Sequence, residues 1–379
     1  MRLLLLFFIA FIALSCDSQN NPASEGPQPS PAEQEISFYV GADLSYVNEM
    51  LDCGAKYKTA GGQVEDPYRI FAQAGTNLVR VRLWHHPRWT DYSNLADVKK
   101  TLKRAKDAGM HTLLDFHYSD TWADPEKQEI PAAWETLLND VPTLADTLYA
   151  YTYSTLMELK QEGIVPQMVQ VGNEINGEIL RHGEPTSINW QRNATLINKG
   201  IAAVRDFSKN EGFQIQVMLH IAQPENALWW FKEAFDAGVL DYDIIGLSYY
   251  PLWSEFKLDT AGKAFKKLIG TYNKKLIVVE TAYPFTLQDQ DGAGNILDED
   301  ALVEGYPATP QGQLDYLLAL AKIIKTAGGD GLVYWEPAWV STPCHTLWGQ
   351  GSHWDNVTLF DKDVRANKAM DFYARAGKE

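Results

Sequence analysis

The sequence contains few cysteines and few positive charges. Only 3 of its 379 residues are cysteine, and 33 lysines and arginines stand against 49 aspartates and glutamates, which gives a net charge of −16. Nucleic acids and other anionic ligands need basic grooves, so this balance argues against them as partners. The apolar run over residues 3–14 is too short to span a membrane, which takes roughly 20 residues. A neutral ligand is the better expectation.

The N-terminal segment has the composition of a signal and a linker. Arg2 precedes the apolar run, and a small residue follows it directly before Cys16, which loosely resembles the site where bacterial lipoproteins are cleaved and lipidated. We predict a lipoprotein signal peptide over residues 1–16, a lipid anchor on Cys16, and a Pro- and Ser-rich flexible tether over 17–35. The remainder, 36–379, is then predicted to be a single catalytic domain. We expect a monomer at the surface or in the periplasm of a bacterial cell envelope.

Apolar runs of strand length alternate with amphipathic stretches along this domain. The predicted strands are 38–43, 77–83, 111–117, 168–174, 215–220, 243–250, 276–280 and 331–336. The amphipathic stretches predict helices that include 94–108, 143–162, 188–208 and 309–326, and the last two have apolar residues three and four apart. Eight such alternations predict an α/β fold, a single (β/α)8 TIM barrel with long βα loops and an active site at the C-terminal ends of its strands.

Two cysteines remain in the predicted barrel. Cys53 follows the first predicted strand and Cys344 follows the last. The loops after these strands are neighbours in a closed barrel, and an oxidising compartment would preserve a disulfide between them. Two free thiols are the alternative, and the sequence does not decide between them.

Polar side chains stand at the end of every predicted strand. Glu174 ends the fourth strand beside Asn173, and Glu280 ends the seventh. Two strands that each deliver one carboxyl group at the C-terminal end are what a retaining glycosidase needs, with one group as acid/base and the other as nucleophile. Either glutamate alone would more often be a helix cap or a loop ion pair. The 12 Trp and 18 Tyr also suit a sugar ligand, because aromatic faces stack on sugar rings, although most must be core residues.

Longer motifs carry a resemblance to a known family. They lie at residues 41–45, 81–84, 115–125, 170–174 and 246–251. The run Asp-Phe-His-Tyr-Ser-Asp-Thr-Trp-Ala-Asp-Pro is the most specific of them. Together they resemble glycoside hydrolase family 53, in the 4/7 superfamily of clan A. The resemblance implies an arabinogalactan endo-β-1,4-galactanase that hydrolyses the β-1,4-galactan side chains of pectin.

The resemblance and the chemistry together suggest roles for the strand-end residues. Glu280 is expected to be the nucleophile and Glu174 the acid/base, kept protonated by burial and by negative charge nearby. Arg82 is expected beside Glu280, where it would keep that group ionised. The other residues expected to bind substrate are Asp43, Trp84, His117, Trp122, Asn173, Tyr250 and Trp335. Among these, Asn173 would bind the sugar 2-hydroxyl, Tyr250 would hold Glu280, and Trp335 would form the floor.

An acidic, glycine-containing loop follows the seventh strand. Its oxygen-bearing residues suit calcium, although the full calcium-hand pattern is absent because Asp300 stands where that pattern has Glu. The resemblance implies a structural calcium site between the loops after strands seven and eight. The matching positions are Asp289, Asp291, Ala293, Asn295, Ser352 and Asp355. A solvated acidic loop remains the alternative.

Other functions remain open. A clan A hydrolase of mannan, xylan or β-glucan would use the same two glutamates. A non-catalytic, glycan-binding surface lipoprotein is an alternative from a different class, and the presence of both Glu174 and Glu280 argues against it. A zinc hydrolase is disfavoured, because His85, His86 and His117 lack the helical His-x-x-x-His spacing.

Overall fold

Eight parallel strands close into one barrel. A computed structural model describes residues 36–183, 187–347 and 349–378. The strands follow one another in chain order around the barrel, and β8 pairs with β1. They are β1 (Tyr39–Asp43), β2 (Leu78–Leu83), β3 (His111–Phe116), β4 (Met168–Val171), β5 (Gln216–Ala222), β6 (Ile244–Ser248), β7 (Lys275–Glu280) and β8 (Gly331–Tyr334). The prediction of a single (β/α)8 TIM barrel is confirmed.

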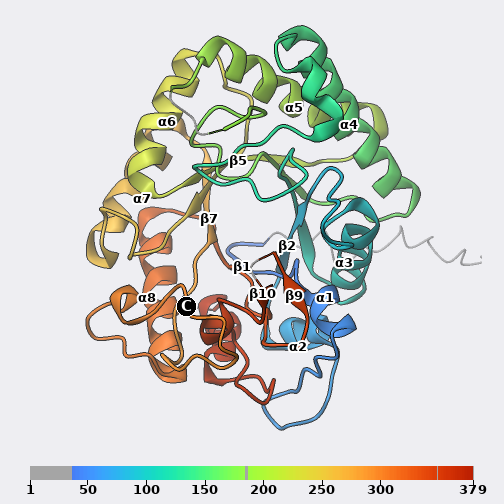
Figure 1. Cartoon of the computed structure of the whole chain (residues 1–379). Helices are drawn as coiled ribbons and strands as arrows, with labels where there is room; N and C mark the ends of the chain where they lie inside the picture. The colour runs from blue at the N-terminus through green and yellow to red at the C-terminus, as the bar shows by residue number, and fades with distance from the viewer. Residues whose placement is uncertain (1–35, 184–186, 348, 379) are drawn as a thin grey trace, which may run out of the picture. The chain divides into compact units, whose positions relative to one another are not determined.

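Helices surround the barrel strands (Figure 1). The α-helices are α1 (Val47–Asp52), α2 (Pro67–Ala74), α3 (Leu95–Asp107), α4 (Val141–Gln161), α5 (Trp190–Glu211), α6 (Pro224–Asp236), α7 (Leu258–Tyr272), α8 (Pro310–Ala327) and α9 (Phe372–Ala376). Short 3₁₀ turns occur at Ala132–Leu137, Glu299–Ala301, Asp355–Val357 and Lys368–Asp371, and a small hairpin joins β9 (His345–Thr346) to β10 (Gly349–Gln350). Among the described residues, no helix is long and apolar enough to cross a membrane.

The helix ends follow local sequence signals. The side chain of Thr309 caps α8 by accepting a hydrogen bond from the Gly312 N–H, and Pro310 occupies the first turn, where its missing N–H costs nothing. At the other end, Gly328 takes a left-handed conformation with φ of 89°, which a residue with a side chain adopts poorly. These signals place α8 within one residue of its predicted bounds.

The barrel interior changes from apolar to polar along the strands. Near the amino-terminal ends of the strands the interior is an apolar layer, which includes Leu78, Leu113, Met168, Met218 and Ile244. Successive side chains of a strand alternate between its two faces, so the residues two positions later also point inward. Those residues are Arg80, Asp115, Gln170, His220 and Gly246, at the carboxyl ends of the strands. The polar layer is therefore built directly on the apolar one.

A disulfide connects the first and last βα segments. Cys53, at the C-terminal end of α1, is bonded to Cys344 in the segment after β8, and their Cα atoms are 5.8 Å apart. Of the two alternatives that the sequence left open, the structure therefore shows the bridge. The predicted signal peptide, the lipid anchor on Cys16 and the tether lie outside the described residues.

Candidate active site

A cleft opens at the carboxyl ends of the strands. Nine of the predicted site residues line it, namely Asp43, Arg82, His117, Trp122, Asn173, Glu174, Tyr250, Glu280 and Trp335. Sequence reasoning did not assign a site role to six further lining residues, Arg80, Asp115, Ala123, Asp124, Trp253 and Trp354. Trp84 was expected in the wall but is only 1% exposed, and its ring packs behind that of Trp122. This expectation was wrong because β2 ends at Leu83, so the alternation of its side chains does not extend to the next residue.

Glu174 and Glu280 face one another across this cleft. An oxygen of each carboxyl group lies within 4.8 Å of the other and of a ring nitrogen of His220. A retaining glycosidase has carboxyl groups about 5–5.5 Å apart, whereas an inverting one keeps them about 6.5–9.5 Å apart to admit a water molecule. Glu174 has a left-handed backbone with φ of 43°, just beyond the end of β4. The separation fits the retaining arrangement.

The cation beside Glu280 is Arg80. Its Nη1 atom lies 2.8 Å from Glu280 Oε1 and 2.9 Å from Asp43 Oδ2, while Nη2 donates to Asp115 Oδ2 at 2.9 Å and to Asn173 Oδ1 at 2.7 Å. Arg80 is 1% exposed, so little water screens these contacts. One guanidinium group therefore positions Glu280 and Asn173 together.

The expected pairing of Arg82 with Glu280 was wrong. Arg82 instead donates from Nη1 to Glu336 Oε1 at 2.6 Å, and its guanidinium carbon lies 4.4 Å from the centre of the Trp122 ring. Arg80 and Arg82 both point into the barrel because they are two residues apart on one strand. Arg82 thus packs against the ring of Trp122. Arg80, two residues earlier on the strand, contacts the carboxylate of Glu280.

Burial raises the pKa of Glu174 to about 7, and the negative charges of Asp124 and Asp115 add to this effect. Burial also raises the pKa of Glu280, and the charge of Glu174 raises it further, whereas the Arg80 guanidinium opposes both effects. Of these two glutamates, Glu280 is the one that forms an ion pair with Arg80, at 2.8 Å. We therefore assign the negative charge to Glu280 and the proton to Glu174, as the sequence analysis expected.

This assignment predicts how activity depends on pH. Glu174 is protonated below pH 7 and ionised above it, so kcat/KM should be retained on the acid side and fall about tenfold per pH unit above roughly 7. The measurement is kcat/KM for a soluble oligosaccharide from pH 5 to pH 9. A profile that stays flat up to pH 9 would show that no group with a pKa near 7 acts as the acid.

The remaining predicted residues surround this pair. Burial raises the pKa of the Tyr250 hydroxyl well above its ordinary value, and the charges of Glu280 and Glu174 add to it, so the hydroxyl stays protonated beside them. The Trp335 ring lies edge-on to the Trp354 ring, with 4.5 Å between the ring centres. Trp253 stands next to Tyr250, lines the cleft and is 47% exposed. The cleft combines two carboxyl groups with aromatic surfaces.

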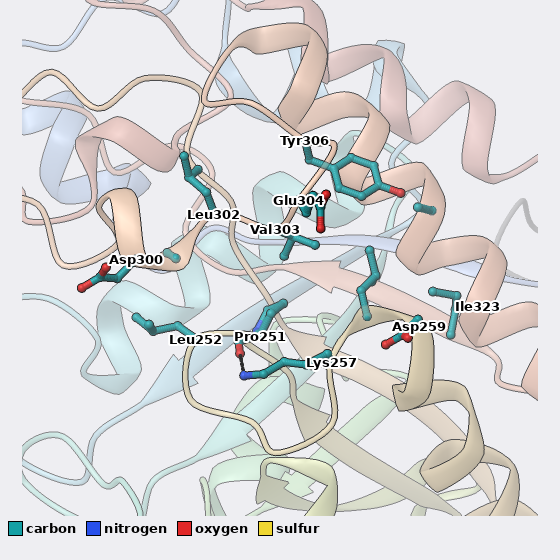
Figure 2. A pocket seen from close by; sticks show the side chains of 13 residues that line it. Pro251, Leu252, Lys257, Asp259, Asp300, Leu302, Val303, Glu304, Tyr306 and Ile323 are labelled. Carbon is teal, nitrogen blue, oxygen red and sulfur yellow. Dashed lines mark hydrogen bonds between the residues drawn. The ribbon is translucent and has the colours of Figure 1, made fainter.

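A larger cavity of about 800 Å³ lies behind the loop after β6 (Figure 2). It is lined by that loop, by the segment before α8 and by α8 itself, and Leu258, Val303 and Ile323 are among its apolar side chains. Lys257 in this cavity donates from Nζ to the carbonyl groups of Pro251 and Ser254. The lysine therefore fixes the loop that carries Trp253. Glu174 and Glu280 are not among the residues that line this cavity.

Three of the predicted calcium ligands come together. Carboxylate oxygens of Asp289, Asp291 and Asp355 lie within 4.8 Å of one another. Two buried acceptors, Asp355 Oδ1 and Asn295 Oδ1, have no hydrogen-bond partner among the described residues. The N–H of Ser352 donates to Asp291 Oδ2, which joins the two loops. Ala293 donates its N–H to Asp291 Oδ1. Clustered carboxylates with unpaired oxygens fit a hard cation such as Ca²⁺.

Comparisons with known proteins agree with this geometry. The model of the family described as Glycosyl hydrolase family 53 matches residues 39–373. An arabinogalactan endo-beta-1,4-galactanase of Cellvibrio japonicus is 60% identical over 339 residues, which cover 88% of this chain and 89% of that protein. An endo-beta-1,4-galactanase of Bacillus subtilis is 37% identical over 314 residues, 80% of this chain and 70% of that protein. The solved Ignisphaera aggregans GH53 catalytic domain superposes with a TM-score of 0.83 at 32% identity, covering 92% of this chain and 98% of that one.

Proposed function

Because the chain belongs to glycosyl hydrolase family 53, we infer that it is a retaining endo-β-1,4-galactanase. It hydrolyses the β-1,4-galactan side chains of pectin. The observation that carries this conclusion is the close approach of the carboxyl groups of Glu174 and Glu280, together with the ion pair between Arg80 and the carboxylate of Glu280. The alternative of a binding protein without activity is not favoured, because the whole acid and nucleophile arrangement is present.

The two glutamates are proposed to act in two displacements. Glu280 attacks the anomeric carbon, the bond to the departing oxygen breaks, and Glu174 gives that oxygen its proton. A galactosyl ester of Glu280 remains. Glu174, now a carboxylate, then takes a proton from water, whose oxygen attacks the same carbon and releases Glu280. Two inversions give net retention at the anomeric carbon.

Neighbouring side chains are proposed to bind the sugar. Asn173 Nδ2 donates one hydrogen to the Ala123 carbonyl at 2.8 Å, so its second amide hydrogen can reach the sugar 2-hydroxyl. That contact strengthens as positive charge develops on the ring. Trp335 offers an apolar face beneath the ring, and Asp43 and His117 border the same cleft.

Substrate specificity is tested with a panel of polysaccharides. We expect the purified protein to release oligosaccharides from linear β-1,4-galactan and to leave mannan, xylan and mixed β-glucan essentially intact. Chain-internal cleavage would appear as a rapid fall in viscosity before short products accumulate. Preferential hydrolysis of one of the other three polymers would reject the galactanase assignment while preserving the retaining chemistry.

We further propose a structural calcium ion held by Asp289, Asp291, Asn295 and Asp355, with Ser352 and the Ala293 carbonyl nearby. The unpaired oxygens of Asn295 and Asp355 support this proposal. A cation would neutralise three clustered carboxylates and join the loops after β7 and β8, beside the cleft but apart from the two glutamates.

Calcium is therefore expected to raise thermal stability. Added Ca²⁺ should increase the melting temperature by a few degrees, because a ligand that binds only the folded state stabilises it by mass action. Asp355→Asn should abolish the increase, whereas Asp300→Asn, at an exposed position in the segment between β7 and α8, should keep it. The measurement is calorimetry of the EDTA-treated protein with and without calcium. An equal increase in both variants would contradict the proposed site.

The envelope location is also a proposal. It rests on the apolar run and Cys16 in the sequence, which lie outside the described residues. We propose that a lipid on Cys16 anchors the enzyme and that the enzyme is a monomer. Cys16→Ser should move the protein from the membrane fraction to the soluble fraction, with its size by light scattering unchanged at one chain. Membrane retention of the variant would contradict the anchor.

A further inference from the structure

Glu174 touches a chain of side chains that the two displacements do not use. Ser248 Oγ lies 2.5 Å from Glu174 Oε1, and His220 Nε2 lies 2.9 Å from the same Oγ. On the other side of the ring, His220 Nδ1 lies 2.9 Å from Asn173 Oδ1. Ser248 and His220 are buried, with 1% and 0% exposure, so these groups must satisfy one another. The position of each hydrogen therefore depends on all four of these hydrogen-bonded side chains together.

The amide of Asn173 determines which nitrogen of His220 carries hydrogen. Asn173 Nδ2 donates to the Ala123 carbonyl, and Oδ1 accepts from Arg80 Nη2, so this amide cannot be turned over. Oδ1 can only accept, so Nδ1 of His220 must donate to it. Burial, and then the charge of Arg80, holds the pKa of His220 well below its ordinary value. The ring is therefore neutral, and Nε2 is an acceptor.

Two weaker contacts favour the opposite tautomer and must be weighed. Gln170 Nε2 lies 3.1 Å from His220 Nδ1, and the Glu174 N–H lies 3.4 Å from it. Gln170 is fixed because its Oε1 accepts from Arg80 Nε, and its two amide hydrogens have acceptors in Asp115 Oδ1 at 2.6 Å and the Gly172 carbonyl at 3.1 Å. The side-chain amide of Gln170 is therefore fully hydrogen-bonded without a contact to His220. The shorter contact with Asn173 Oδ1 prevails.

We propose that His220 and Ser248 are positioning residues that keep the proton on Glu174 in the free enzyme. Nε2 of His220 accepts the hydroxyl hydrogen of Ser248, and the oxygen of Ser248 accepts the carboxylic acid hydrogen of Glu174. All three groups are satisfied in this state. When Glu174 is ionised, the hydroxyl of Ser248 turns to the carboxylate, and Nε2 is left as a buried acceptor without a donor, which is unfavourable.

The proposal rests on the proposed function, in which Glu174 is the acid/base. It adds that the turning of one hydroxyl accompanies each change of charge on Glu174. After Glu174 protonates the departing oxygen, Ser248 donates to the new carboxylate until water returns the proton. The titratable and charged groups that act on Glu174 and His220 are Arg80, Asp115, His117, Asp124, Tyr250 and Glu280.

The tautomer of His220 tests the proposal directly, without substrate. In the ¹⁵N-histidine-labelled enzyme below pH 7, we expect one imidazole with hydrogen on Nδ1 and none on Nε2, which does not titrate. His220→Gln should remove these two signals and so assign them. Should that variant not fold, Ser248→Ala should shift the Nε2 signal alone and leave the tautomer unchanged. A His220 with hydrogen on Nε2, or with both nitrogens protonated, overturns the proposal.

The pH profile gives a second readout that a merely structural role would not move. His220→Phe removes the acceptor for Ser248, so the hydroxyl can donate to ionised Glu174 at no cost to its neighbour. The basic limb of kcat/KM should then move to lower pH by about half to one pH unit. A matched substitution, His111→Phe, at the far end of β3 should leave the limb in place. An unmoved limb in a folded His220→Phe enzyme would overturn the proposal, and the NMR result does not depend on whether galactan is the substrate.

Discussion

Replacing Glu280 with alanine is expected to lower kcat on galactan by a factor of about 10⁴ or more, because no covalent intermediate can form without the nucleophile. The buried Arg80 would lose one of its carboxylate partners but keep Asp43 and Asp115, so the variant should still fold. Kinetic measurement with circular dichroism separates the two effects. The exposed Glu255→Gln on the loop after β6 is the matched control and should keep full activity.

Azide identifies the face from which Glu280 acts. A small anion can enter the space left by the carboxylate in Glu280→Ala and attack the anomeric carbon directly. One displacement by azide inverts the configuration, so an α-galactosyl azide should form from a substrate with a good leaving group. A β-galactosyl azide, or a variant with near-normal activity, would show that Glu280 is not the nucleophile.

Replacing Glu174 with alanine is expected to slow galactan hydrolysis by about 10²–10⁴-fold, the usual contribution of a positioned acid/base. The loss should depend on the leaving group. An aryl galactobioside with a good leaving group needs little protonation, so its first displacement should be slowed far less. Azide should rescue the second displacement and give a β-galactosyl azide, because the sugar is already attached to Glu280.

The pH profile adds a check on the Glu174 experiment. The variant should lose the basic limb near pH 7, since the group with that pKa has been removed. Glu336→Gln would not serve as a control variant, because the buried Glu336 pairs with Arg82, which packs against the ring of Trp122 in the cleft. Equal rate losses for good and poor leaving groups would indicate that Glu174 does not protonate the leaving oxygen.

The sequence predicted the barrel and both glutamates because their signals are local. Apolar runs mark the strands, and an acidic residue directly after a run lies at the functional end of a TIM barrel. The choice between Arg80 and Arg82 could not be made in this way. Both point into the barrel by alternation, and only the height of each side chain above the apolar layer decides that Arg80 meets Glu280.

Residues on long loops were the hardest to predict. Trp253 and Trp354 line the cleft from loops after β6 and β8, whose paths depend on packing between segments far apart in the sequence. Their rings stand 6.4 Å apart although 101 positions separate them in the numbering. His220 lies on β5 and Ser248 ends β6, and their contacts with Glu174 depend on three strands coming together at one place, which no local sequence signal shows.

The measurement that tests the central claim most directly is the anomeric configuration of the first product. Proton NMR can follow a β-1,4-galacto-oligosaccharide during the first minutes of hydrolysis, before the new reducing end equilibrates. A double displacement by Glu280 and Glu174 predicts that the β-anomer appears first and converts slowly to the α-anomer. Initial appearance of the α-anomer would contradict the retaining mechanism, and no hydrolysis of the galacto-oligosaccharide would contradict the assigned function itself.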